Sequence, residues 1–496
     1  MSLLEDILAK GYFPAELPPC FTTATFAAAC AFPNGAPQGF QRPKMAQLCN
    51  FSLAKAGNAR FRRRLSLVNP INFFQIATLV ASNWAVLERH MRTSVLSMSR
   101  AVYRPNGARA LSHLSYSPAN RVDRQAKDRG TAKALLVADI SEFYHSIYTH
   151  SIPWALHTKP IAKANHTLNL LGNRLDRAIQ NAQHGQTIGI PIGPDTSLVI
   201  SEVILSSLET NLRLRIPFLR GSRFVDDFEL SFPDYASAEN ALAILQEELL
   251  QFELRLNPRK TSVRIPPVGL EPEWVSELRK FKIRNNAGER GDLIAYFDLM
   301  TRFLLLHPND HVSKYGLQRF KQFQPRLANI PLYQSLLCHI GVVEPGSIRE
   351  VIYALLFLRS NTPFLLDAQV LQETLNAVIK SSTPLGHQYE AVWALWAAMQ
   401  FNIQLDQETI AVLDCTDNSL VGILACDAFA KGFAPNLDMT RWASRMNAQD
   451  LRGEEWLLSY EANVHGWLGT VGGGDHVAAD SEFGYLKANG VRFYVP

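Results

Sequence analysis

The sequence predicts a chain of two unlike parts: an α+β N-terminal half followed by an all-α, solenoid-like C-terminal domain. Two observations predict the first part. Residues 134–140 form a short apolar run typical of a buried strand, and residues 223–232 surround an acidic bend with alternating apolar side chains, as in a β-hairpin. A third observation predicts the second part, because amphipathic helical segments follow one another from about residue 276 to residue 470.

We expect three regions along the chain. Residues 1–55 are rich in Pro, Gly, Ala and aromatic residues, which suits an N-terminal extension better than an independent domain. Residues 56–275 contain the helices and short strands of the α+β part, and several prolines punctuate its end. Residues 276–496 form the helical domain, whose short polar or Pro/Gly links suggest stacked, HEAT-like helical pairs without a recognisable repeat consensus.

Composition is that of an ordinary globular protein, with 47% apolar and 19% charged residues. The net charge of +4 indicates no overall electrostatic attraction to nucleic acid. Basic residues do gather upstream of the first acidic motif, at Arg60, Arg62, Arg63, Arg64, Arg100, Arg104, Arg109, Arg121, Arg124, Lys127 and Arg129. We expect some of them to bind phosphate, the alternative being a solvated charged face.

Cysteine spacing and hydropathy indicate the compartment. The six cysteines lack any C-x-x-C pairing, so they are typical of reduced thiols rather than of disulfides or a zinc site. No segment approaches 18 apolar residues, and the acidic N-terminus lacks the basic flank of a signal peptide. We therefore expect a cytoplasmic protein that does not associate with membranes.

The adjacent acids Asp226 and Asp227 lie between apolar residues at the expected hairpin bend. Burying two carboxylates together is unfavourable unless a metal ion or another cation compensates their charge. The pair is therefore a candidate site for a divalent metal. The alternative is a solvated turn, where Asp-Asp pairs are common.

A third acid, Asp139, ends the apolar run 134–140 and could face the hairpin across a sheet. Such an arrangement suits phosphoryl or nucleotidyl transfer, in which carboxylates hold two metal ions roughly 4 Å apart around the reacting oxygens. Mg²⁺ prefers carboxylate ligands and keeps water and substrate phosphates as its other ligands. Taken alone, Asp139 could equally be a turn residue or a helix N-cap.

Four motifs together resemble those of reverse transcriptases, in the same order. They are Asp139-Ile-Ser-Glu-Phe-Tyr144, the Gly-Ile-Pro-Ile-Gly-Pro-Asp-Thr-Ser run at 189–197, Phe-Val-Asp-Asp at 224–227, and Leu256-Asn-Pro-Arg-Lys-Thr261 after a helix-like segment at 237–252. The longer string from Asp139 to Trp154 is similar to the abortive-infection (Abi) polymerases, the AbiK, AbiA and prophage-borne group. The resemblance is close over about residues 100–265 and implies reverse-transcriptase-like palm and fingers for residues 56–275, with residues 1–55 as an extension of the fingers.

The resemblance also implies roles for individual residues. Asp139 and Asp226 would bind the metal ions, Mg²⁺ or alternatively Mn²⁺, together with the main-chain carbonyl of Ile140, and Asp227 would be the second acid of its motif. Tyr144 would pack under the sugar of the incoming nucleotide and favour deoxynucleotides. Gly193 and Pro194 would allow a close backbone approach to the nucleotide or to the terminal base pair. Lys260 would neutralise or protonate the leaving pyrophosphate, unless it is an ordinary surface lysine.

One departure from the family pattern bears on function. Templated enzymes usually have Gln before the glycine of the second motif, whereas this chain has Ile192. The departure agrees with the Abi group, whose members are thought to add deoxynucleotides without a template to a tyrosine of the protein itself. The resemblance thus implies single-stranded DNA attached covalently to the chain, and a homo-oligomer. Tyr12, Tyr103 and Tyr494 are candidate primers.

Two other functions remain open. A template-copying reverse transcriptase of the retron or intron type would use an RNA partner, and its product sequence would depend on the template. A vestigial palm serving only as a binding or assembly module would be catalytically silent, although the presence of all three acids argues against it.

Overall fold

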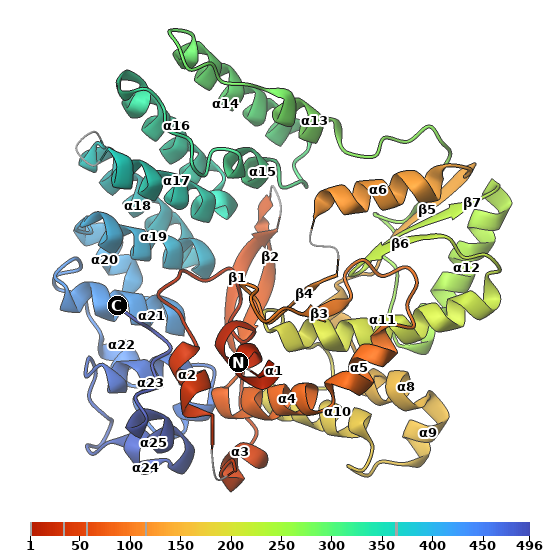
Figure 1. Cartoon of the computed structure of the whole chain (residues 1–496). Coiled ribbons are helices and arrows are strands. Elements are labelled where there is room, and N and C mark those ends of the chain that lie inside the picture. Colours follow the sequence, from red (N-terminus) through yellow and green to blue (C-terminus); the bar gives the residue numbers. More distant parts are fainter. Residues whose placement is uncertain (1, 33–34, 56–57, 115–116, 363–365) are drawn as a thin grey trace.

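The computed structural model describes residues 2–32, 35–55, 58–114, 117–362 and 366–496, without the side chains at positions 58–60 and 118. The side chain of Arg60, one of the basic residues singled out above, therefore lies outside the described part. An α+β half and a helical half lie side by side, with the hairpin β1–β2 between them (Figure 1). This division into an α+β part and a helical part agrees with the prediction from the sequence.

A four-stranded antiparallel sheet is the centre of the first half. Its order is β6-β7-β5-β8, and its strands are β6 (Gly221–Phe224), β7 (Asp227–Phe232), β5 (Ala134–Asp139) and β8 (Ser262–Arg264). Strand β5 is buried along nearly its whole length, as its apolar sequence predicts. Helices α6 (Pro118–Arg129) and α12 (Tyr235–Gln251) pack on the sheet, and the long helix α11 (Asp195–Arg215) runs beside α12.

Further elements surround this sheet. Helix α4 (Pro70–Ser82) begins at Pro70 after an Asn69 cap, and helix α5 (Trp84–Met91) follows it. The remaining elements of this half are β3 (Ala101–Tyr103), β4 (Leu111–His113), α7 (Phe143–Ser146), α8 (Ser151–His157), α9 (Lys159–Ala164) and α10 (Leu171–Ala182).

The hairpin of β1 (Cys49–Lys55) and β2 (Asn58–Leu67) joins the two halves. Its Arg62 donates hydrogen bonds to Glu390 at 2.5 and 2.9 Å, and Glu390 is fully buried in helix α19 (Gln388–Phe401). At its other end, the Ser66 N–H donates to the carbonyl of Ile192 at 2.9 Å. The hairpin therefore connects the helical half to the loop that precedes α11.

The second half is helical in its described residues, as the sequence predicts. Neighbouring helices pack in succession, with large indoles such as those of Trp393 and Trp456 fully buried between them. The other helices are α13 (Glu273–Lys280), α14 (Glu289–Leu306), α15 (Val312–Gln318), α16 (Ile330–Val343), α17 (Ile348–Asn361), α18 (Ala368–Ser382), α20 (Gln407–Leu413), α21 (Ser419–Ala430), α22 (Thr440–Ala443), α23 (Trp456–Val464), α24 (His476–Ala479) and α25 (Ser481–Ala488). In the described residues, no helix combines the length and the hydrophobicity that crossing a bilayer requires.

The N-terminal extension packs against both halves. It contains α1 (Leu3–Lys10), α2 (Ala24–Ala29) and α3 (Gln38–Gln41). Residues 20–22 pair with the end of the chain, since the Thr22 N–H donates to the Phe493 carbonyl and the Val495 N–H donates to the Cys20 carbonyl. The Trp393 indole donates to the carbonyl of Glu16, which ties the extension to the helical half.

Candidate active site

The sheet register brings two of the three predicted carboxylates together. Strands β5 and β7 pair so that Asp139 lies directly opposite Asp227. Asp226 lies in the bend between β6 and β7, and its carbonyl accepts a hydrogen bond from the Ile140 N–H at 3.3 Å. The two segments carrying the acids are therefore held edge to edge by main-chain bonds, as the hairpin interpretation predicts.

The two acids of the bend, Asp226 and Asp227, have raised pKa values. Burial, together with the charges of Asp227 and Asp139, raises the pKa of Asp226 to about 6. Burial also raises the pKa of Asp227, with Asp139 adding to the effect and Arg121 opposing it. Carboxyl groups with raised pKa values at one end of a sheet are typical of a functional site rather than of a solvated turn.

One lysine and one amide contact Asp139. Lys260 Nζ lies 2.8 Å from Asp139 Oδ2, and Asn257 Nδ2 lies 3.1 Å from Asp139 Oδ1. Burial would lower the pKa of Lys260, but its bond to Asp139 and the charges of the nearby acids raise it. Lys260 thus supplies positive charge to the acids directly. Asn257 belongs to the same motif as Lys260, but no sequence pattern indicates the role of its side chain, because only the fold brings it to Asp139.

The donor set fits a hard divalent cation. The carboxylates of Asp139, Asp226 and Asp227 supply the oxygen ligands that such ions prefer. Among the described residues, however, no group of three or more His, Cys, Asp or Glu side chains lies close enough together to hold a metal ion by itself. A metal ion here would therefore take part of its ligands from elsewhere, as Mg²⁺ does when it keeps water and phosphate oxygens.

Tyr144 lies in α7, shortly after the end of strand β5. Its half-buried ring packs beside Phe143, and its hydroxyl accepts a hydrogen bond from Ser201 Oγ at 3.4 Å. Burial raises the pKa of Tyr144 to about 12, and the charges of both Asp226 and Arg63 act on the phenol. The ring is therefore within electrostatic reach of an acid of the bend and of an arginine of the hairpin.

The loop before α11 is covered by the N-terminal extension. Gly193 has a φ of +135°, and a Cβ at this position would lie 2.5 Å from Pro14 Cγ. Pro194 is buried and caps α11. The next residue, Asp195, forms a buried ion pair with Arg109 at 2.6 Å. The close approach that a glycine permits here is thus made by Pro14.

The structure separates the basic residues into two groups. Several have structural partners: Arg62 pairs with Glu390, Arg109 with Asp195, Arg124 with Asp128 and Arg129 with Glu229. Arg63 and Arg121 form no ion pair with any described residue, and their charges act on Tyr144 and Asp227 respectively. Arg121 also lies over the ring of Phe224, 5.6 Å from its centroid. Arg121 thus acts on an acid of the bend and Arg63 on Tyr144, a distinction that no sequence pattern revealed.

The tyrosines named as candidate primers are engaged in packing. Tyr12 is fully buried, stacks on Phe73 and donates to the Val68 carbonyl. Tyr494 is buried and donates to Asp427 at 2.6 Å, and Tyr103 donates to Asp6 at 2.8 Å. In this conformation neither Tyr12 nor Tyr494 is accessible as an attacking hydroxyl.

Comparison with known proteins agrees with this geometry. Residues 82–282 match the family model of the reverse transcriptase (RNA-dependent DNA polymerase), a range that includes all three acids and Lys260. No curated protein has significant similarity to the chain. The N-terminal half therefore contains a reverse-transcriptase-like domain, which is the fold of a nucleotidyl-transferring polymerase.

Proposed function

We propose that this chain is an antiphage, abortive-infection DNA polymerase of the Abi group, which joins deoxynucleotides without a template to a tyrosine of the protein. The observation that carries the proposal is the pairing of Asp139 with Asp227 beside the bend of Asp226, within a reverse-transcriptase-like domain. In the proposal, Asp139, Asp226 and the Ile140 carbonyl hold Mg²⁺, or alternatively Mn²⁺, and Asp227 completes the acidic set. When bound, the metal ions supply Lewis-acid activation of the attacking hydroxyl and charge stabilisation of the pyrophosphate.

The chain's own residues would position the nucleotide. Arg63 and Arg121, which have no carboxylate partner among the described residues, would bind the triphosphate oxygens. The ring of Tyr144 would lie under the sugar and exclude a 2′-hydroxyl. Lys260 would leave Asp139 and donate a proton, or a hydrogen bond, to the departing pyrophosphate. Gly193 and Pro194 would shape the wall of the nucleotide site together with Pro14.

Two features support synthesis without a template. Ile192 replaces the Gln that templated enzymes usually have before the glycine. Pro14 covers Gly193, where a templating base pair would otherwise approach the loop. Both features place apolar groups where a template-copying enzyme needs polar contacts or open space.

Protein priming requires a tyrosine that can reach the acids. Because Tyr12 and Tyr494 are buried, we propose that the primer comes from a segment that moves or from another copy in a homo-oligomer. The helical half, which we regard as a HEAT-like scaffold, would support that assembly and retain the attached single-stranded DNA. The reaction would take place in the cytoplasm, where deoxynucleotides are available.

The test is a labelling experiment on the full-length protein. Purified protein is incubated with Mg²⁺ and each labelled deoxynucleotide in the absence of nucleic acid, and the products are resolved on a denaturing protein gel. Label that stays on the polypeptide and disappears in Asp226→Ala is expected. Free labelled DNA that forms only after RNA or DNA is added would instead identify a template-dependent reverse transcriptase, and no incorporation under either condition would contradict both functions.

A further inference from the structure

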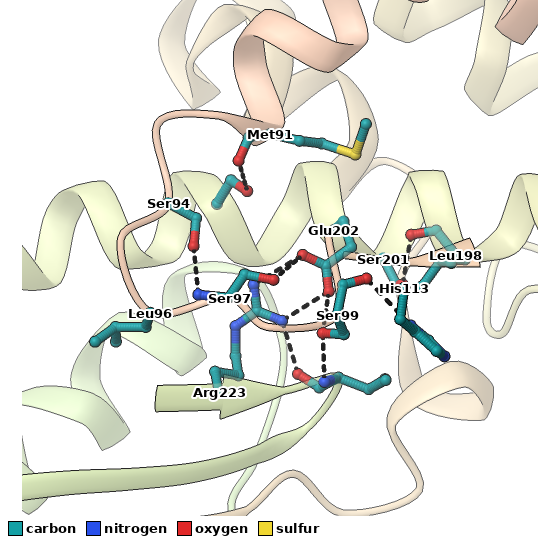
Figure 2. A network of polar contacts seen from close by, with 12 residues as sticks. Met91, Ser94, Leu96, Ser97, Ser99, His113, Leu198, Ser201, Glu202 and Arg223 are labelled. Atoms are coloured by element: carbon teal, nitrogen blue, oxygen red, sulfur yellow. Dashed lines mark hydrogen bonds and ion pairs between the residues drawn. The ribbon is translucent and has the colours of Figure 1, made fainter. Parts of the chain in front are cut away.

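Arg223 is a fully buried arginine next to the acidic bend. It lies in β6, three residues before Asp226, and none of its side chain is exposed. Its Nε donates to Glu209 at 2.5 Å. Its Nη1 and Nη2 donate to Glu202 at 2.9 and 3.0 Å (Figure 2). Arginine is almost never fully buried unless it is paired, and here two carboxylates of α11 pair with it.

Arg223 and Ser99 bind the two main-chain polar groups of Val225, the residue before Asp226. Arg223 Nη1 donates to the Val225 carbonyl at 2.8 Å. The Val225 N–H donates to Ser99 Oγ at 2.7 Å, and Ser99 in turn donates to Glu202 at 2.7 Å. The peptide groups on either side of Val225 are thus both attached to the Arg223–Glu202 pair.

Val225 needs this attachment because its backbone is strained. Its φ is +53°, in the left-handed region that a β-branched residue rarely adopts. Strain of this kind persists only where the surroundings enforce it. Without the bonds from Arg223 and Ser99, the bend would relax towards an ordinary turn, and the carboxylate of Asp226 would move with it.

The attachment extends to two other segments. Glu202 and Glu209 belong to α11, whose first residue, Asp195, follows Gly193 and Pro194. The segment 94–99 also contacts both glutamates, since Ser97 donates to Glu202 at 2.7 Å and the Leu96 N–H donates to Glu209 at 3.3 Å. The bend that carries Asp226 is therefore fixed to the same helix as the loop at the proposed nucleotide site.

We infer that Arg223, Glu202 and Ser99 are positioning residues, which hold Asp226 where it binds a divalent metal ion. The inference rests on the proposed function, because it assumes that Asp226 is a metal ligand. Lysine could not replace Arg223, since a single ammonium group cannot reach Glu202, Glu209 and the Val225 carbonyl in the geometry of the guanidinium fork.

Two serines provide a matched pair of variants. Ser97 and Ser99 each donate one hydrogen bond of 2.7 Å to Glu202, but only Ser99 also accepts the Val225 N–H. Ser97→Ala and Ser99→Ala thus remove the same contact to the glutamate, whereas only Ser99→Ala releases the bend. If the two serines served only to hold Glu202 in place, both substitutions would change Mn²⁺ binding to the same extent.

The experiment is a calorimetric titration of the full-length protein with Mn²⁺ alone, together with a thermal unfolding curve for each variant. We expect Ser99→Ala to weaken Mn²⁺ binding about five- to tenfold, the effect of losing one hydrogen bond, and Ser97→Ala to change it less than about twofold. Both variants should remain folded, with Ser99→Ala the less stable of the two because it also leaves the Val225 N–H without its acceptor. Arg223→Lys, if it folds, should weaken Mn²⁺ binding at least as much as Ser99→Ala.

The outcomes separate this inference from the function on which it rests. If the unaltered protein binds Mn²⁺ and the two serine variants bind it equally well, the positioning role is wrong and the metal site stands. If the unaltered protein binds no Mn²⁺, the metal site itself is wrong, and the positioning role fails with it.

Discussion

Lys260 Nζ lies 2.8 Å from Asp139 Oδ2, so the charged end of a largely exposed lysine contacts a carboxylate that is almost completely buried. The lysine thus supplies a cationic partner to Asp139, in addition to the charge of Arg121 that acts on Asp227. A divalent ion that binds Asp139 would replace this contact and release the ammonium group towards solvent. Metal binding and the proposed role of Lys260 in protonating pyrophosphate are therefore linked through one carboxylate.

The Asp226→Asn variant should lose activity but gain stability. The carboxylate is the proposed metal ligand, so metal-dependent incorporation should fall at least about 1,000-fold. The pKa of Asp226 is raised to about 6, which means that its ionised form destabilises the metal-free fold. Thermal unfolding in chelator at pH 7.5 should show Asp226→Asn to be more stable by roughly 1–2 kcal/mol.

The sign of the pH dependence provides a control for that prediction. A carboxyl whose pKa is raised by folding binds more protons in the folded state, so its contribution to stability falls as the pH rises from about 4 to about 6. The difference in unfolding free energy between the variant and the unaltered protein should therefore shrink towards pH 4. An advantage that stays constant over this range would contradict the assignment.

The Lys260→Met variant should slow turnover without preventing metal binding. General acid catalysis typically contributes 10²–10⁴-fold, so we expect kcat to fall by about 100-fold at saturating Mg²⁺. The matched control is Arg259→Met, because Arg259 is the adjacent exposed cation and contacts none of the acids. Equal loss of activity in both variants, measured by single-nucleotide incorporation, would indicate a general effect of surface charge instead.

The neighbouring arginines Arg62 and Arg63 should differ in what they control. Arg63→Gln should raise the KM for deoxynucleotide about tenfold, because its side chain has no carboxylate partner in the described part of the chain and is proposed to bind phosphate. Arg62→Gln should instead leave KM unchanged and destabilise the fold by roughly 3 kcal/mol, because it strands the buried Glu390. Steady-state kinetics and chemical unfolding of both variants test this, and reversed effects would refute it.

Tyr144 should control the choice of sugar through its ring. Tyr144→Ala should increase incorporation of ribonucleotides relative to deoxynucleotides by about 100-fold, since the steric barrier to a 2′-hydroxyl is removed. Tyr144→Phe should retain the discrimination, although it loses the contact between Ser201 and the hydroxyl. Competition assays with paired nucleotides provide the measurement. Unchanged selectivity in Tyr144→Ala would remove this residue from the sugar site.

Local sequence patterns were sufficient for the elements that carry the acids. The apolar run ending at Asp139 is strand β5, the acidic pair lies at the hairpin of β6 and β7, and the expected helix at 237–252 is α12. These predictions succeeded because both patterns lie in consecutive residues: a buried central strand is a continuous apolar run, and a hairpin strand alternates apolar and polar side chains. Strand β2 was not predicted, because its arginine-rich sequence does not indicate its pairing with β1 or the contact of Arg62 with Glu390 of α19.

Contacts between distant residues decided the remaining features. The sequence does not distinguish among the arginines of the basic clusters, such as Arg62, Arg63, Arg109 and Arg121. Only the fold shows that Arg62 pairs with Glu390 and Arg109 with Asp195, whereas the other two have no carboxylate partner among the described residues. The burial of Tyr12 depends on Phe73 and on the end of the chain. Nothing in the sequence around Arg223 indicates a buried ion pair, because its partners Glu202 and Glu209 lie on α11. The sequence by itself thus identified the three acids and the strand and hairpin that carry them. Their exact positions depend on the tertiary structure, because the buried charges that hold the bend pair with residues far away in the chain.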